Sequence, residues 1–411
     1  TELHMDTKTP IVFMDEVLKY AIENGIIDLS RIQEEIEMTK REELLKKHPY
    51  SIWKSKDGKW HTYLPDEEKR VPRKRKTKKE IEDLIVEYWK QQEENPKLSE
   101  VFEKWLENKL EFEEIKKGSA DRYETDFIRF FEKSGFADRR IKTITEDDLE
   151  AFIKKQIIEN KLTPKTYSGL RLIVRGIFKF AKKRKWATIS ISTFFNDLEL
   201  SKNSFTKKVV ETDKQVFNED ELPRLCEYLK ERGTIRDLGV LLLLETGIRV
   251  GELAALKRSD WDGDVLKIRR TETRYKDERK KTVIGVQDFP KTDAGFRDVI
   301  LTKKSIETLN RIVELNPHTE YLLQSERGMR TRGNTFNKRL EGALTDLGMP
   351  LRSTHKGRRT YITTLIDAGC DDAVVTKQAG HKSIDTSRKY YYYSNKTAAH
   401  QKEQVQKAIK I

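Results

Sequence analysis

The chain has 411 residues, which is too long for one ordinary hydrophobic core, so we expect two to four domains. Charged residues make up 37% of the sequence and the formal net charge is +13, which indicates a polyanionic partner. Only Cys226 and Cys370 are present, which excludes a disulfide framework and favours a cytoplasmic protein, and no apolar run is long enough to span a membrane.

Residues 1–49 are predicted to form a helical extension, with two helices within 9–46. The second helix is indicated by Ile32 and Ile36 at helical spacing, followed by Leu44. The sequence indicates no role for this extension.

A small module is predicted over residues 50–92. Its short aromatic segments at 50–54 and 60–64 are typical of β-strands, and Lys56-Asp57-Gly58-Lys59 between them is a hairpin turn signal. A third strand is expected over 69–73, inside a stretch from Lys69 to Lys79 that holds eight basic residues and no acidic one. A helix is expected to begin at Lys78.

A charge run by itself is more often a solvated face or a linker. Here the flanking hairpin and helix favour a module that lays its strands in a DNA groove. The candidate DNA contacts are basic and aromatic residues of the strands and the basic run: Trp53, Lys54, Lys59, Trp60, Arg73, Lys74 and Arg75.

Residues 97–195 carry only helical patterns. Four apolar stripes predict a compact helical bundle, and such stripes form a core far more often than a cofactor site. The basic residues predicted to face outward could hold the phosphates of a duplex; they are Lys165, Arg171, Arg175 and Lys179. A polar linker is expected over 196–215.

Residues 214–411 mix helices and strands. Strands are predicted over 265–275, 283–287 and 297–301, with residues 291–295 as the turn between the last two. Helices are predicted over 305–315, 334–347 and 358–367, and the tail from Thr397 carries a short helix. The predicted fold is therefore multidomain and mainly α with an α+β part: a three-stranded sheet plus helix, a helical bundle, and a mixed α/β domain.

Six residues of this last block are the side chains needed to attack a DNA phosphodiester: Arg249, Lys291, His355, Arg358, His381 and Tyr390. Arginine forks stabilise the charge of a pentacoordinate phosphorane, and histidines donate hydrogen bonds or relay protons. A lysine at a hairpin tip protonates the leaving oxygen, and a tyrosine phenolate is a nucleophile. No cysteine or carboxylate cluster completes a metal site, so we expect neither a metal nor another cofactor.

The ordered set resembles the catalytic domain of the tyrosine recombinases, the phage integrase family, over residues 216–399. Four segments carry the resemblance: residues 246–253, residues 289–301, His355-Lys356-Gly357-Arg358, and Gly380-His381 followed nine residues later by Tyr390. The two preceding blocks resemble the family's arm-binding and core-binding domains. An arm-binding domain is typical of integrases from temperate phages and conjugative transposons.

The resemblance implies a site-specific recombinase that joins DNA to Tyr390 through a 3′-phosphotyrosine and integrates and excises a mobile element. It implies core and arm sites on double-stranded DNA and a homo-tetramer on two such sites. An excision factor and a host DNA-bending protein are further expected partners, and no membrane is involved. The tail either folds onto its own domain or docks into a neighbouring subunit.

Several alternatives remain open from the sequence. Tyr391 is the second candidate nucleophile, and Arg359 competes with Arg358 because Gly357 stands where the family carries an apolar residue. Glu252 either orients Arg249 or forms a surface pair. Lys280 and Lys281 compete with Lys291. The alternative functions are a catalytically silent DNA-binding regulator and a topoisomerase with the same tyrosine chemistry.

Overall fold

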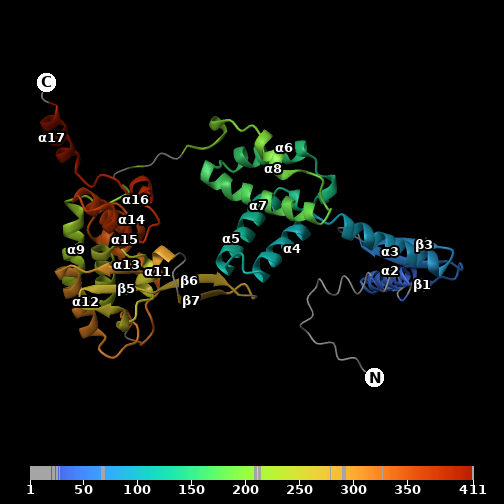
Figure 1. Cartoon of the computed structure of the whole chain (residues 1–411), viewed down its shortest axis with the longest axis horizontal. Coiled ribbons are helices and arrows are strands. Elements are labelled where there is room, and N and C mark those ends of the chain that lie inside the picture. Colours follow the sequence, from blue (N-terminus) through green and yellow to red (C-terminus); the bar gives the residue numbers. More distant parts are fainter. Residues whose placement is uncertain are drawn as a thin grey trace. The chain divides into compact units, whose positions relative to one another are not determined.

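The structure is a computed structural model of the chain, shown in Figure 1. The chain divides into two compact units. One unit comprises residues 1–114 and 125–206, and the other comprises residues 115–124 and 207–411. The described residues are Tyr20, Asn24, Ile26, 28–65, 70–207, 211, 214–277, 279–288, 293–325 and 327–409. Among the helices that these residues form, none has the length and apolar character needed to cross a membrane.

The N-terminal module contains a three-stranded antiparallel sheet in the order β1-β2-β3 with two helices. Its elements are α2 (Leu29–Lys46), β1 (Trp53–Lys54), β2 (Trp60–Pro65), β3 (Arg70–Arg75) and α3 (Lys78–Glu94). Gly58 adopts a positive φ of 80° in the turn between β1 and β2, as the hairpin signal predicted. The first predicted helix of the extension and Lys69 lie outside the described residues.

Strand alternation divides the sheet into two faces. Thr62 and Leu64 of β2 are buried, and Leu64 packs with Ile81 and Ile85 of α3. Thr77 and Glu80 form a capping box that begins α3 at its predicted place. The opposite face of the sheet therefore presents the intervening residues of β2.

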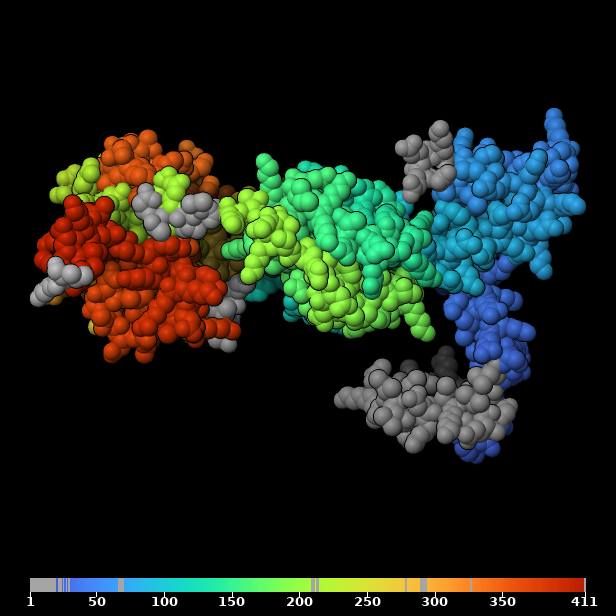
Figure 2. Space-filling view, turned by 90° about the horizontal axis from the view of Figure 1, so that it is seen from above, coloured from blue at the N-terminus to red at the C-terminus, as the bar shows by residue number. Residues whose placement is uncertain are grey.

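Helix α2 is attached to this module by its C-terminal half only. Leu44 is buried, and Arg41 forms ion pairs with Glu82 and Asp83 of α3. Residues 31–40 are exposed throughout, and Figure 2 shows this part of the chain in dark blue projecting from the lighter blue body of the module. The predicted second helix of the extension is thus present, with its N-terminal half uncovered.

The following block is helical, as predicted. Its helices are α4 (Leu98–Glu111), α5 (Lys117–Phe127), α6 (Glu146–Glu159), α7 (Pro164–Lys183) and α8 (Ile191–Asp197). Stacked rings fill part of its core, with Phe102 and Phe127 centroids 3.9 Å apart and Phe136 and Phe152 centroids 4.1 Å apart. The apolar stripes are therefore core.

The C-terminal unit surrounds one buried helix, α10, against which α9, α12, α13 and α14 pack. Its helices are α9 (Glu221–Arg232), α10 (Ile235–Thr246), α11 (Val250–Ala254), α12 (Lys303–Leu315), α13 (Gly333–Asp346), α14 (Thr354–Asp367), α15 (Asp372–Ala379), α16 (Ile384–Tyr390) and α17 (Ala398–Ala408). Its strands are β4 (Trp261–Asp262), β5 (Val265–Ile268), β6 (Arg270–Lys276), β7 (Thr282–Asp288) and β8 (Arg297–Ile300).

Strand pairing in this unit differs from the prediction. The segment predicted as one strand over 265–275 is two strands, β5 and β6, and β8 pairs with β5 while β7 pairs with β6. In the turn between β6 and β7, the carbonyl of Asp277 accepts a hydrogen bond from the N–H of Lys280, and the N–H of Asp277 donates one to the carbonyl of Lys281. This local hairpin pairs β7 with β6, so β7 does not pair with β8 as predicted. The strands β7 and β8 therefore belong to two different sheets and do not form the predicted hairpin.

Candidate active site

Arg249 is held at a sharp turn between α10 and α11. Gly247 ends α10 with a φ of 63°, and a Cβ there would lie 2.2 Å from Cδ1 of Tyr361. Arg249 then caps α11: its backbone N–H donates to Oε2 of Glu252 at 2.9 Å, and its guanidinium donates to Oε1 at 2.8 Å. Only glycine therefore fits at position 247, in the turn that leads to Arg249.

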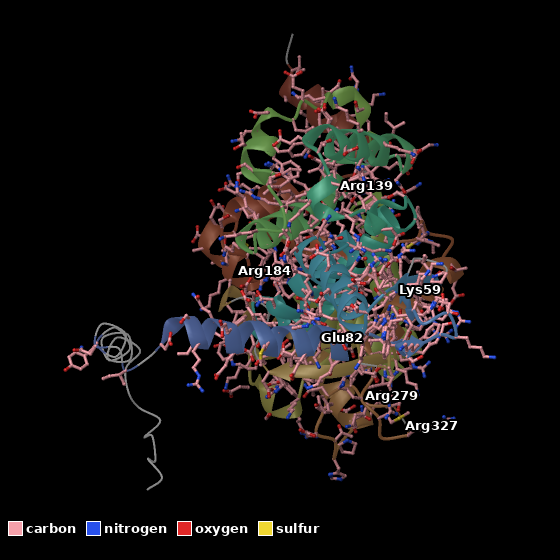
Figure 3. The ribbon with its side chains drawn as sticks, turned by 90° about the vertical axis from the view of Figure 1, so that its right-hand side faces the viewer. Lys59, Glu82, Arg139, Arg184, Arg279 and Arg327 are labelled. Carbon is pink, nitrogen blue, oxygen red and sulfur yellow. The ribbon has the colours of Figure 1, made fainter. Side chains whose placement is uncertain are left out.

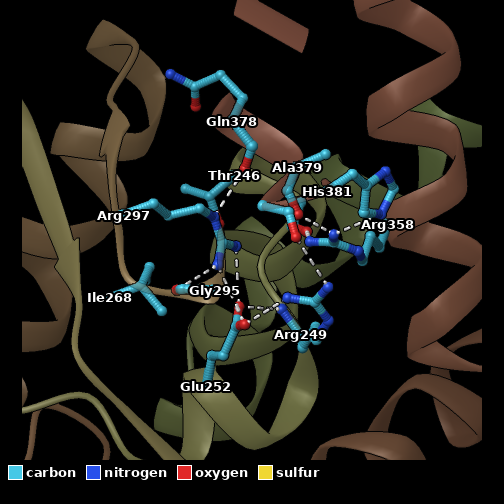
Figure 4. A network of polar contacts seen from close by, with 12 residues as sticks. Thr246, Arg249, Glu252, Ile268, Gly295, Arg297, Arg358, Gln378, Ala379 and His381 are labelled. Atoms are coloured by element: carbon cyan, nitrogen blue, oxygen red, sulfur yellow. Dashed lines mark hydrogen bonds and ion pairs between the residues drawn. The ribbon is translucent and has the colours of Figure 1, made fainter. Parts of the chain in front are cut away.

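Glu252 lies buried between two arginines, as Figure 4 shows. Arg297 donates to both of its oxygens, at 3.1 Å and 2.9 Å. Burial opposes ionisation of Glu252, but Arg297 and then Arg249 outweigh burial and lower its pKa to about 2. Glu252 therefore orients Arg249 and is not a surface pair.

Arg358 is the charged residue that α14 buries most completely, with 1% exposed. Its guanidinium donates to the carbonyl of Gly247 at 2.6 Å and to that of Ala379. Burial and then the charge of Arg249 lower its pKa to about 10. The neighbouring Arg359 is half-buried and hydrogen-bonds to the side chain of Gln215. Arg358, and not Arg359, is thus the arginine that joins Arg249.

Close packing between two helices explains why Gly357 precedes Arg358. A Cβ at Gly357 would lie 2.7 Å from Cδ2 of Leu244. Helix α14 therefore approaches the buried helix α10 closely at this position, and a larger apolar side chain would overlap the side chain of Leu244.

His381 follows a second tight turn. Gly380 has a φ of 61°, and a Cβ there would lie 2.8 Å from the carbonyl oxygen of Ala294. Nε2 of His381 lies 3.1 Å from the Arg358 guanidinium, and Nδ1 lies 2.8 Å from Oγ of Ser387. Because arginine only donates, Nε2 accepts and Nδ1 donates to Ser387. Burial and then Arg358 lower the pKa of His381 to about 3, so its ring is neutral.

His355 lies in the first turn of α14 with an exposed side chain. Partial desolvation and then the charges of Arg359 and Arg358 lower its pKa to about 4. This histidine is therefore also neutral near pH 7, and its ring is open to a ligand.

The two candidate tyrosines have different surroundings. Tyr390 is the last residue of α16 and is 54% exposed. The ring of Tyr391 lies 4.4 Å from that of His381 and 5.2 Å from that of His355, and Cζ of Arg358 lies 5.6 Å from its centroid. Spacing predicted Tyr390, whereas the structure brings Tyr391 against the histidines.

The structure places the candidate lysines differently from the arginines and histidines only where they are described. Lys291 lies outside the described residues. Its competitors Lys280 and Lys281 are exposed in the turn between β6 and β7, next to Arg279, which Figure 3 labels. Within the described ranges, no group of three or more histidine, cysteine, aspartate or glutamate side chains could hold a metal ion.

Arg297 is the site residue that sequence reasoning missed. It was expected only as the start of a strand, yet it is 5% exposed and contacts Glu252. Strand alternation carries a signal that could have revealed it: Arg297 and the buried Val299 share a face of β8, so a charged residue occupies an inward position. A buried charge needs a partner, and Glu252 supplies it.

The predicted DNA contacts of the N-terminal module divide between the two faces of the sheet. Trp53 lies beside His61 on the outer face, with rings 5.7 Å apart, and Lys74 pairs with His61 across the strands. Trp60 instead packs, partly buried, against the Leu64, Ile81 and Ile85 cluster on the other face. The other candidates are exposed at strand positions or lie in the turn: Lys54, Lys59 (labelled in Figure 3), Arg73 and Arg75.

In the helical block, the basic candidates all lie on α7. Lys165, Arg171, Arg175 and Lys179 are exposed, while Leu170, Ile173, Val174, Ile177 and Phe178 of the same helix are buried. The spacing of four between the last three basic residues places them on one solvent-facing side.

The C-terminal unit thus gathers three arginines around the buried carboxylate of Glu252. Arg249, Arg297 and Arg358 carry three positive charges, and Glu252 neutralises one of them. The two histidines beside them are neutral, and Arg249 is still 39% exposed. Such an arrangement binds an anion with extra negative charge, such as the phosphorane of a phosphodiester under attack.

This geometry agrees with the matches to known proteins. Residues 215–397 match the phage integrase family, so this part of the chain is a domain of the phage integrase type, as the resemblance to the tyrosine recombinases implied. The protein is a site-specific recombinase, an enzyme of DNA strand exchange.

The curated relatives include phage and transposon proteins. The chain is 26% identical over 310 residues to the prophage ps2 probable integrase of Lactococcus lactis, covering 70% of this chain and 76% of that protein. It is 24% identical over 209 residues to the transposase of transposon Tn916 from Enterococcus faecalis, covering 46% of this chain and 51% of that protein.

Solved structures share the fold. The integrase of transposon Tn1549 in complex with transposon right end DNA matches with a TM-score of 0.58 at 15% identity, covering 76% of this chain and 99% of that one. A lambda integrase dimer bound to a core site matches with a TM-score of 0.53 at 17% identity, covering 84% and 95%. The mainly α prediction with small sheets is confirmed.

Proposed function

We propose that this recombinase integrates and excises a mobile element by cutting each DNA strand through a 3′-phosphotyrosine intermediate. The observation that carries the proposal is the set of three arginines around the buried Glu252, with two neutral histidines and two tyrosines beside it. The similarity to a prophage integrase and a transposon transposase supports a mobile element as the source of the DNA. We further propose that the protein acts in the cytoplasm, where its DNA substrate lies.

In the proposed reaction, the guanidinium groups of Arg249 and Arg358 bind the non-bridging oxygens of the scissile phosphate. A tyrosine oxygen attacks phosphorus, the bond to the 5′ oxygen breaks, and Lys291 protonates that leaving oxygen. Neutral His355 accepts the proton of the phenol, which its lowered pKa permits near pH 7. The phosphotyrosine bond conserves the energy of the phosphodiester, so a 5′ hydroxyl of another strand can attack it and rejoin the DNA.

We propose Tyr390 as the nucleophile, with Tyr391 as the alternative. Tyr391 packs against the apolar cluster of Ile362, Val375 and Ala379, and its carbonyl accepts a hydrogen bond from Thr363. A residue anchored in this way is suited to support the histidines. The exposed Tyr390, at the end of α16, is free to turn toward a phosphate.

We propose that four protomers act on two DNA sites, using a core-binding helical block and an arm-binding sheet. Related integrases have been solved on DNA, including a lambda integrase tetramer on a Holliday junction, which supports DNA and other protomers as partners. An excision factor and a host DNA-bending protein belong to the proposal as expected partners of an integrase that also excises.

The test is covalent capture on nicked duplexes that carry the ends of the element, followed by a denaturing gel and peptide mapping. Wild-type protein should leave a DNA adduct on Tyr390. Tyr390→Phe should abolish the adduct, while the adjacent matched variant Tyr391→Phe should retain it.

An adduct that maps to Tyr391 would keep the chemistry and overturn the choice of nucleophile. Tight binding without any adduct, on duplexes from both ends, would instead support a DNA-binding regulator. Relaxation of supercoiled plasmids that lack these ends would support a topoisomerase.

A further inference from the structure

Arg297 connects three segments that are distant in the sequence. Its Nε donates to the carbonyl of Gln378 at 3.0 Å, and one guanidinium nitrogen donates to the carbonyl of Gly295 at 3.2 Å. Both guanidinium nitrogens also donate to Glu252. The side chain is 3% exposed, so it has no direct access to a large ligand such as DNA. Figure 4 shows the Glu252 carboxylate joined to Arg297 on one side and to Arg249 on the other.

The first consequence of this position concerns Arg249. Each oxygen of Glu252 accepts two hydrogen bonds, one from Arg249 and one from Arg297. Arg297 therefore neutralises the carboxylate, and the charge of Arg249 stays available for a phosphate. Without Arg297, Arg249 would be the direct partner of a buried carboxylate and would lose much of its attraction for an anion.

The second consequence concerns His381. Arg297 holds the carbonyl of Gln378, and a Cβ at Gly380 would lie 3.0 Å from Cδ of Arg297. Arg249 also donates to the carbonyl of Gly380, at 3.3 Å. The turn that carries His381 is thus held from both sides by two arginines that share Glu252.

We propose that Arg297 is a positioning residue for strand cleavage, a role that rests on the proposed function. It acts through Glu252 and through the turn at residues 378–380. Through Glu252, it keeps Arg249 oriented and keeps the positive charge of Arg249 available to the scissile phosphate. Through the turn, it keeps His381 in place. It does not itself touch the DNA.

The test compares single-turnover cleavage of nicked duplexes by wild type, Arg297→Met and Arg297→Lys. The matched control is Arg339→Lys, because Arg339 pairs with the buried Asp237 at the opposite end of α10. Arg297→Met should cleave about 100-fold more slowly than wild type, the loss typical of one misplaced charge-stabilising donor. Arg297→Lys keeps the charge but not the fork and should lose about tenfold. The control should stay within about threefold of wild type.

A second substrate separates positioning from loss of folding. In a duplex with a methylphosphonate at the scissile position, one negative oxygen is replaced by a neutral methyl group. The free charge of Arg249 matters less there, so the gap between wild type and Arg297→Met should narrow to about tenfold or less. DNA binding and the melting temperature are measured for every variant.

An equal gap on both substrates would overturn the assignment, because a merely structural defect slows both alike. Arg297→Met cleaving as fast as the Arg339→Lys control would also overturn it. If wild type forms no adduct on either substrate, the proposed function itself fails, which is distinguishable from both of these outcomes.

Discussion

At the scale of single residues, the site combines buried positive charge with neutral histidines. Arg358 and Glu252 are nearly inaccessible, and each finds opposite charge or carbonyl oxygens within hydrogen-bond distance. Burial and then the same positive charges lower the pKa of both histidines. Burying these groups is costly for folding, and the net positive charge that results is what a phosphate can neutralise.

His381 should make stability fall in acid. Its pKa is about 3 in the folded protein, below the ordinary value of 6.5, so the unfolded chain binds more protons between these values. Its contribution is therefore present above pH 6.5 and is lost as the pH falls toward 3. From pH 7 to pH 5 we expect a loss of up to about 2 kcal/mol, measured by urea unfolding. His381→Gln should lose less over the same interval, and an equal loss in both proteins would contradict the assignment.

Gly247→Ala should be more destabilising than Gly263→Ala. Both glycines have a φ near 60°, but only at Gly247 would the new Cβ meet a side chain, Tyr361 at 2.2 Å. Gly263→Ala should cost about 1 kcal/mol from backbone strain alone, and Gly247→Ala about 2 kcal/mol more from overpacking. Denaturant unfolding measures both. Similar losses would show that Tyr361 moves aside easily.

At the scale of elements, α7 is the clearest case of two faces on one helix. Its apolar residues are buried in the helical core, and its basic residues face solvent every fourth position. Because phosphate contacts position a protein on DNA without reading its sequence, this face should bind any duplex to some degree.

Arg175→Ala should weaken binding to duplex DNA and lower the steepness of its salt dependence. Removing one arginine–phosphate interaction should reduce the slope of log affinity against log salt by about 0.9. Lys154→Ala on α6 is the control, since Lys154 is exposed but already paired with Glu150. Affinities are measured between low and moderate salt. An unchanged slope in Arg175→Ala would remove α7 from the DNA interface.

At the scale of the whole molecule, the described part of the tail is held to the C-terminal unit at its base. Glu219 accepts hydrogen bonds from the backbone N–H of Thr397, from His400 and from Lys396. Helix α17 itself buries no residue, and in Figure 1 it extends away from the body of this unit. Val405 and Ile409 are more than half exposed. The tail therefore has little to pack on within its own unit.

Truncation after Gln401 should leave stability unchanged but impair assembly. It removes most of α17 while keeping the Glu219 contacts, so we expect a change of less than about 0.5 kcal/mol in unfolding free energy. Complexes of several protomers on DNA, resolved by native gel or light scattering, should become rarer. Glu219→Gln, which keeps the whole helix, is the control. A large loss of stability would mean that α17 packs on its own unit.

The sequence by itself determined the class of this protein. Helical periodicity, the hairpin turn at Gly58 and the short segments that carry the arginines, histidines and tyrosine can be read along the chain without any tertiary contact. Capping at Thr77 and Gly247 likewise depends on neighbouring residues. These features therefore predicted the mainly α architecture and the recombinase family before any tertiary contact was known.

Only the tertiary structure decided how the pieces meet. The role of Arg297, the separate pairing of β7 with β6 and β8 with β5, and the packing of Trp60 into its core depend on residues far apart in the chain. Likewise, the adjacent residues Arg358 and Arg359 have different neighbours in the folded protein, and so do Tyr390 and Tyr391. Burial and charge pairing are properties of the packed interior, and adjacent residues in the sequence carry almost no information about them.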